Sequence, residues 1–150
     1  FDIDVAKKKD ASNPVYYVQY AHARICSILR KAGEEQGLEV GVYTPEELAA
    51  ALDLDNADLS LLTDESELAL LKKMADFKDL VSGAARDRAP YRLTHFAQEL
   101  ASLFHSLYQH CHVLGEECNL TQARLALIDA ARINLALALH LLGVSAPEQM

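Results

Sequence analysis

The sequence predicts an all-α protein, a single helical bundle of about five helices. Signals that start and stop helices are abundant along the chain, whereas the alternating pattern of strands is nearly absent. In each long segment between these signals, apolar residues recur at helical spacing. A chain of 150 residues with 51% hydrophobic and 24% charged residues has room for one sizeable core. These observations exclude a disordered or fibrous protein.

The first long helix is expected to open at Asn13-Pro14, because proline at an early helical position loses no hydrogen bond. Its apolar face repeats over residues 15–32, and Gly33 and Gly37 are expected to end it. Residues 34–42 are predicted to form a connector.

Two further helices are expected in the middle of the chain. The segment 44–47 (TPEE) combines a hydroxyl N-cap, proline at the first position and Glu three residues after the cap, and it predicts a short helix to about Leu52. Residues 53–62 read as an acidic loop. The segment 63–66 (TDES) then opens one continuous helix to about Ala85.

Two long helices complete the predicted bundle. Ala89-Pro90 opens the first, whose apolar stripe extends to Cys111 before Gly115 stops it. Asn119 or Thr121 caps the second. Residues 125–142 are apolar nearly all round, so we expect this last helix at the buried centre, closed by Gly143.

The formal net charge of −8 is concentrated in one segment. Residues 44–87 carry eleven acidic and four basic side chains, while the segments before and after them are nearly neutral. Net acidity disfavours nucleic-acid binding, because phosphate neutralisation supplies much of the affinity. A neutral face is still able to bind RNA by stacking and shape.

No apolar run reaches the roughly 18 residues that predict a membrane span. The chain begins at Phe1 with no leader pattern, so we expect a processed chain or a piece of a longer one. An odd number of cysteines without CxxC spacing indicates reduced thiols in a cytosolic protein, with one disulfide as the alternative. They are Cys26, Cys111 and Cys118.

Motifs that mark catalysis are missing. There is no Gly-rich phosphate loop, no GxSxG elbow and no HExxH, so we expect no catalytic residue and no cofactor in this chain. The run His110-Cys111-His112, with Cys118 beyond it, suggests a metal site. On a helix, however, the two histidines point about 200° apart and the cysteine lies on the apolar stripe. A structural thiol beside two surface imidazoles is the favoured interpretation.

Two surfaces carry residues suited to RNA. Opposite the apolar face of the first long helix lies a strip of aromatic and basic residues, which stack bases and hold phosphates: Tyr16, Tyr20, Arg24, Ser27 and Lys31. The alternative is that the tyrosines pack against a neighbouring helix. The outer face of the helix after Pro90 is polar, nearly uncharged and rich in rings and amides: Tyr91, His95, Gln98, Ser102, His105, Gln109 and His112. It suits hydrogen bonds to base edges, or a face covered by another domain or by the N-terminal residues.

Several segments of the sequence also resemble those of a known protein family. Residues 13–25 (NPVYYVQYAHARI) resemble the point in bacterial arginyl-tRNA synthetases where the catalytic domain gives way to the anticodon-binding domain. Residues 1–4 resemble the last acidic segment of the synthetase body, and residues 104–113 are similar to the family's Phe-x-x-Phe-Tyr helix. Residues 123–127, together with 141–143 and 146–150, resemble the family's C-terminal end.

This resemblance implies the C-terminal anticodon-binding domain, of the DALR type, of a class I arginine–tRNA ligase. Residues 1–13 would be the end of the synthetase body or its junction, and residues 14–150 the helical domain. The parent enzyme would join arginine to its tRNA with ATP and magnesium. The HIGH-type and KMSKS-type motifs of that chemistry are absent, so we expect the chain to bind without catalysing. Its expected partners are the anticodon stem-loop of an arginine tRNA and the N-terminal catalytic body of the same polypeptide, in a cytoplasmic monomer without membrane contact.

The resemblance also ranks the candidate contacts. It favours Tyr108, His105 and His112 for bases, Arg124 for a phosphate or for positioning, and Met150 as an apolar contact at the chain end, in addition to Tyr16, Tyr20 and Arg24. Tyr108 borders the apolar stripe, so core packing is its rival role. Gln19, His22 and Arg24 match a motif near the domain junction and would hold that junction or touch RNA. His112 and Gln149 stand where the family commonly has Arg, which weakens phosphate contact there.

An alternative from another class is a helical adapter that docks a protein partner on its polar face and has no RNA role. Salt separates the two, because phosphate-driven binding weakens steeply with salt and apolar docking hardly responds. A self-contained enzyme has no constellation of residues to support it.

Overall fold

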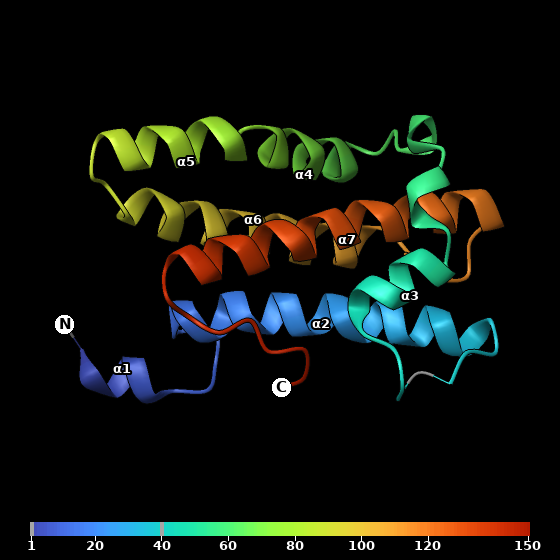
Figure 1. Ribbon diagram of the computed structural model, residues 1–150, viewed down its shortest axis with the longest axis horizontal. Helices are drawn as coiled ribbons and strands as arrows, with labels where there is room; N and C mark the ends of the chain where they lie inside the picture. The colour runs from blue at the N-terminus through green and yellow to red at the C-terminus, as the bar shows by residue number, and fades with distance from the viewer. Residues whose placement is uncertain (1, 40) are drawn as a thin grey trace.

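A computed structural model describes residues 2–39 and 41–150, and every long element in these ranges is a helix. Figure 1 shows three layers: α4 and α5, then α6 and α7, then α2 with α3 beside it. This confirms the predicted all-α bundle. Two residues lie outside the described ranges: Phe1, in the segment 1–4 that resembles the synthetase body, and Val40, in the predicted connector 34–42. The helices are α1 (Ile3–Lys7), α2 (Pro14–Glu35), α3 (Pro45–Ala51), α4 (Glu65–Ala75), α5 (Phe77–Arg86), α6 (Tyr91–His110) and α7 (Cys118–Leu141), with short 3-10 turns at Leu54–Asn56 and Leu59–Leu61.

The core lies where α6 and α7 meet the two outer layers. α6 packs on α2, α4, α5 and α7, so its position is determined from several sides. Each large apolar side chain buried in this way stabilises the fold by about 1.5–3 kcal/mol. The largest ones that are fully buried include Phe96, Leu100, Phe104 and Leu107 of α6, Ile25 and Leu29 of α2, and Leu127, Ile128 and Leu135 of α7.

Asn13 fixes the start of α2 and ties α1 to it. Its side-chain oxygen accepts a hydrogen bond from the backbone N–H of Val15 at 3.1 Å, which caps the helix. Its amide nitrogen donates to the carbonyl oxygens of Ala6 (3.0 Å) and Lys8 (2.9 Å). One buried side chain therefore orients both the helix and the segment before it.

Gly33 does not end α2, contrary to the expectation from sequence. The helix continues to Glu35, and Gly37 closes it with a φ of +81°, a conformation that favours glycine. Gly33 has a packing role instead: a Cβ atom there would lie 3.0 Å from Leu48 Cδ2 of α3. The small residue lets α3 approach α2 closely.

The helix expected over residues 63–85 is divided into α4 and α5 at Asp76. Asp76 keeps a right-handed helical conformation, so the two helices stay roughly in line (Figure 1). Aspartate is a weak helix former, because its short side chain competes for backbone groups. After the break, Phe77 stacks on Phe96 of α6 with ring centroids 4.8 Å apart.

α7 lies in the middle layer, as its apolar sequence predicts, but it is not buried all round. Ile133, Leu137 and Leu141 follow one another at four-residue spacing and are 44%, 47% and 52% exposed. This exposed stripe was not expected from sequence, because periodicity cannot separate the faces of a helix that is apolar on every side. None of the helices in the described ranges has the length and apolarity that crossing a membrane requires.

Candidate nucleic-acid interface

Two adjoining grooves run between α2 and α6 and share three side chains: Tyr20, Arg24 and Tyr108. The larger, which we call the tail groove, has a volume of about 810 Å³ and is walled by α2, residues 111–114 and the C-terminal Gln149 and Met150. The smaller, the tyrosine groove, has a volume of about 450 Å³. It adds Ala11, Tyr16, Tyr17, His105 and Gln109 to the shared three.

Seven of the eight contact residues predicted from sequence line these grooves. Ser27 and Lys31, the rest of the predicted strip on α2, lie in the tail groove as well. Arg124 lines neither groove. The other seven are Tyr16, Tyr20, Arg24, His105 and Tyr108 in the tyrosine groove, and Tyr20, Arg24, Tyr108, His112 and Met150 in the tail groove.

Arg24 provides a fixed positive charge where the two grooves meet. Its Nη1 donates to the Tyr20 hydroxyl at 3.0 Å, and its guanidinium carbon lies 4.3 Å from the centroid of the Tyr108 ring. A cation over an aromatic face in this way is worth about 0.5–1 kcal/mol at an exposed site. The guanidinium stays charged at every physiological pH and has further N–H groups to donate to a phosphate or a base.

Aromatic rings continue from Arg24 along the tyrosine groove. Tyr16 and Tyr20 lie nearly parallel, with centroids 6.4 Å apart and 10° between their planes, and His105 lies 5.9 Å from Tyr20. Tyr20 and Tyr108 are 38% and 39% exposed, so neither side chain is buried in the core. Partly exposed rings beside a cation form the kind of surface on which unpaired bases stack.

His105 is the neutral polar group of this cluster. Burial lowers the pKa of His105 below its ordinary value, and the positive charge of Arg24 lowers it further. Its Nε2 is buried and has no hydrogen-bond partner among the described residues. Such an unpaired atom costs about 1–3 kcal/mol, and a base edge or a water that reached it would relieve that cost.

The lowered pKa of His105 predicts a dependence of stability on pH. Between the ordinary histidine pKa of about 6.5 and the lower folded value, the unfolded chain binds more protons, so the free energy of unfolding falls as the pH falls. Removing this titration in His105→Gln should make the curve less steep below about pH 6.5, while His22, whose pKa is lowered too, keeps its own contribution. Urea unfolding at several pH values measures it, with His95→Gln on the exposed part of α6 as the matched control. Equal slopes for His105→Gln and the unmodified chain would contradict the assignment.

The C-terminal tail, residues 143–150, lies along α2 and is held by its main-chain carbonyl groups. Gln19 Nε2 donates to the carbonyl oxygen of Ser145 at 2.9 Å, and His22 Nδ1 donates to that of Pro147 at 2.8 Å. Arg30 Nη2 donates to that of Glu148 at 3.0 Å. Burial lowers the pKa of His22, which is 3% exposed, so the ring is neutral with its proton on Nδ1. Gln19 and His22, expected to hold a domain junction or touch RNA, contact the chain's own tail.

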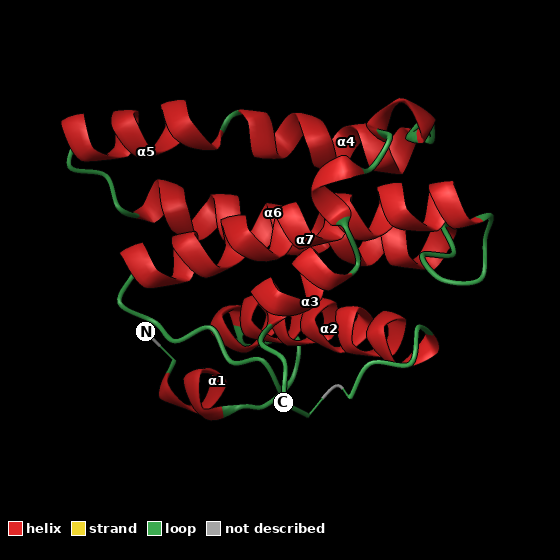
Figure 2. Cartoon of the chain, turned by 45° about the vertical axis from the view of Figure 1, so that its right-hand side comes forward, coloured by secondary structure: helices red, strands yellow, loops and turns green. Residues whose placement is uncertain are grey.

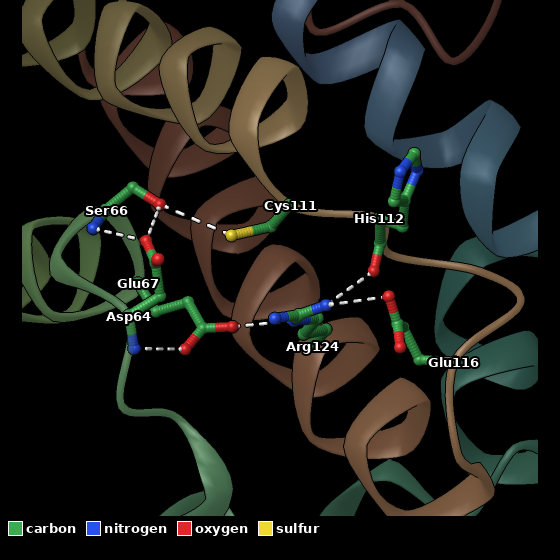
Figure 3. Close-up of polar contacts among 7 residues, drawn as sticks. All are labelled: Asp64, Ser66, Glu67, Cys111, His112, Glu116 and Arg124. Atoms are coloured by element: carbon green, nitrogen blue, oxygen red, sulfur yellow. Dashed lines mark hydrogen bonds and ion pairs between the residues drawn. The ribbon is translucent and has the colours of Figure 1, made fainter.

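Arg124 belongs to an internal ion-pair network rather than to the grooves (Figure 3). Its Nε donates to Glu67 Oε1 at 2.6 Å, and its Nη1 donates to the carbonyl oxygen of His112 at 2.8 Å. The side chains of Arg124 and Glu67 are 12% and 1% exposed. Of the two roles predicted for Arg124, these contacts favour positioning, because they hold the residue that forms part of the tail groove. The role itself stays a prediction.

Glu67 was not among the residues predicted from sequence. Its Oε2 accepts from the backbone N–H of Asp64 at 2.9 Å and so completes a capping box at the start of α4, while Oε1 receives Arg124. The spacing Asp64-x-x-Glu67 is the signal that would have found the capping role. Nothing local indicates the partner on α7.

In the ranges it describes, the structure does not bring together ligands for the metal site suggested by residues 110–112. Among the described residues, no group of three or more His, Cys, Asp or Glu side chains is placed to hold an ion. His110 Nδ1 donates to the carbonyl oxygen of Ser106 at 2.7 Å on its own helix, and Cys111 is buried. Cys26, Cys111 and Cys118 are free thiols.

Comparison with known proteins identifies the fold family. The family profile described as "DALR anticodon binding domain" matches residues 18–150. The chain is 53% identical over its whole length to an arginine–tRNA ligase of Moorella thermoacetica and 48% identical to one of Dehalococcoides mccartyi, covering 25% and 24% of them. The arginyl-tRNA synthetase structure of Thermus thermophilus superposes on the whole chain with a TM-score of 0.76 at 32% identity, over 23% of its own length. The chain spans about a quarter of the curated relatives that it matches, and it belongs to the DALR anticodon-binding domain family.

Proposed function

We propose that this chain binds the anticodon stem-loop of an arginine tRNA through the tail groove and the tyrosine groove. The observation that carries the proposal is the convergence of Tyr20, Arg24 and Tyr108, from two different helices, into both grooves. Exposed rings stack unpaired bases, and the guanidinium offers charged hydrogen bonds to phosphate. Family membership and the arginine–tRNA ligase relatives support the same function.

The distribution of charge supports RNA at this surface despite the net acidity. The acidic segment 44–87 forms α3, the turns after it, α4 and α5. α4 and α5 lie in the layer opposite α2 in both views (Figures 1 and 2). The tail groove, in contrast, is lined by Arg24, Arg30 and Lys31. Beyond about 10 Å, salt screens the carboxylates of α4 and α5 from a phosphate bound there, whereas α3 packs on α2 itself.

The wider setting is part of the proposal. A parent arginine–tRNA ligase would attach arginine to its tRNA with ATP and magnesium, bound by a catalytic body in the same polypeptide. Residues 1–13 would form the junction with that body and residues 14–150 the binding domain, which contributes no catalytic residue and no cofactor of its own. The protein would act as a cytoplasmic monomer. The relatives named above lend no support to the adapter alternative.

The test is a filter-binding titration with an arginine anticodon stem-loop and a second stem-loop altered only in its anticodon bases. We expect the cognate stem-loop to bind more tightly, and its affinity to fall as salt rises, with a slope set by the number of phosphates contacted. Equal binding of the two stem-loops would mean that this chain does not discriminate the anticodon bases by itself. Absence of binding by both at low salt would overturn the proposal for this chain.

A further inference from the structure

Two of the three side chains that hold the C-terminal tail line neither groove. Gln19 and His22 point to the carbonyl oxygens of Ser145 and Pro147, and neither residue is among those that wall the grooves. Gln149 and Met150, only a few residues further on, form part of the wall of the tail groove. The position of that wall therefore depends in part on contacts made outside the groove.

The hydrogen bonds that hold the tail are made mainly to its main chain, with one further bond from Gln19 to the Ser145 hydroxyl at 3.3 Å. Three main-chain carbonyl groups within four residues of the tail are bound by three α2 side chains. The tail itself has no helix and no fully buried side chain; Val144 and Ala146 pack against the core only in part. A segment with so few apolar contacts depends on hydrogen bonds to stay ordered.

We propose that Gln19 and His22 are positioning residues for RNA binding: they hold the tail along α2 so that Gln149 and Met150 complete the tail groove, and they act without touching the RNA. The inference rests on the proposed function of the groove. Arg30 is left out of it, because Arg30 also lines the tail groove and is able to contact RNA directly. The role differs from a domain-junction role, since the partner of both residues is the chain's own tail.

The attachment can be observed without RNA, because the chain has two methionines, Met74 on α4 and Met150. A chain labelled with carbon-13 at the methionine methyl groups gives two NMR signals. Met150 shares its groove with the Tyr20 and Tyr108 rings, so its methyl signal should be displaced from the position of an unstructured methionine. Met74, packed against the core, serves as the internal control for folding.

Two substitutions remove the donors. Gln19→Glu replaces the donating amide with a carboxylate facing a carbonyl oxygen, and His22→Leu replaces the donating ring with an apolar side chain of similar size. We expect both to move the Met150 signal to the unstructured position and to leave Met74 unchanged. His22→Asn, which keeps a nitrogen donor, should restore much of the displacement. Gln36→Glu, at the exposed end of α2, controls for the added charge. An unmoved Met150 signal in both donor variants would overturn the proposal.

Stem-loop binding then separates positioning from contact. Gln19→Glu should weaken binding about 3- to 10-fold in the whole chain, and it should have no further effect in a chain that lacks Gln149 and Met150. Equal weakening in both backgrounds would mean that Gln19 touches RNA, and would overturn the inference. If the unmodified chain binds no stem-loop, the proposed function and the RNA role of these residues fail together, while the Met150 signal still reports whether they hold the tail.

Discussion

Replacement of Glu67 by alanine is expected to lower the free energy of unfolding by about 3–5 kcal/mol, the usual cost of removing one partner from a buried ion pair. Glu67 is 1% exposed, and its loss leaves the Arg124 guanidinium, 12% exposed, without its nearest counter-charge. Glu116 lies further from that guanidinium, at 3.8 Å, and is itself more exposed. Urea unfolding followed by circular dichroism measures the change.

The control for this prediction lies two residues away, in the same turn of the helix. Glu65→Ala removes an exposed carboxylate from the same first turn of α4 and should cost less than about 1 kcal/mol. The double variant Glu67→Leu/Arg124→Leu should recover much of the lost stability, since neither charge is then left buried alone. Equal costs for Glu67→Ala and Glu65→Ala would show that the network does not stabilise the fold.

Replacement of Arg24 by glutamine is expected to weaken stem-loop binding by about 10- to 100-fold, the range for losing a charged hydrogen bond of about 1.5–3 kcal/mol. It should also reduce the slope of log affinity against log salt by about 1, as the loss of one phosphate contact does. Arg24 is the one cation that lines both grooves among the described residues. Titration of the same stem-loop at several salt concentrations gives both quantities.

A matched control is available for the charge itself. Arg86→Gln removes the same charge from α5, in the layer opposite α2, where the side chain is 79% exposed. We expect its effect on binding to be slight and its salt slope to stay near that of the unmodified chain. If the two variants behave alike, Arg24 acts only through the net charge and not by contact.

Local signals predicted the helices well because each acts within a few residues. Asn13 and Thr44 cap α2 and α3 where the sequence indicated, and Thr44 and Glu47 form the expected capping box. Some errors were local: neither Asn119 nor Thr121 caps α7, which begins at Cys118 after Glu117, and Asp76 divides the helix expected over residues 63–85. Another arose where a distant partner decides the outcome. Gly33 resembles a stop signal in the sequence, and only the approach of Leu48 from α3 explains why a glycine stands inside the helix.

The same distinction applies to the candidate site. Tyr16, Tyr20 and Arg24 share one face because they are four residues apart, so their convergence follows from helical geometry. The contacts of Gln19 with Ser145 and of Glu67 with Arg124 join residues 126 and 57 positions apart. Helical periodicity predicts contacts only between residues a few positions apart. Contacts between residues this far apart become visible only once the helices are packed into the bundle.

The place of Met150 in the wall of the tail groove also bears on how the protein should be handled. A purification tag fused after Met150 would emerge from the wall itself, beside Arg24 and Tyr108. A string of histidines there would compete with any incoming nucleotide and add rings of its own to the stack. Affinities measured on such a tagged protein would then describe the tag as much as the domain. A tag placed ahead of α1 would leave this wall unchanged.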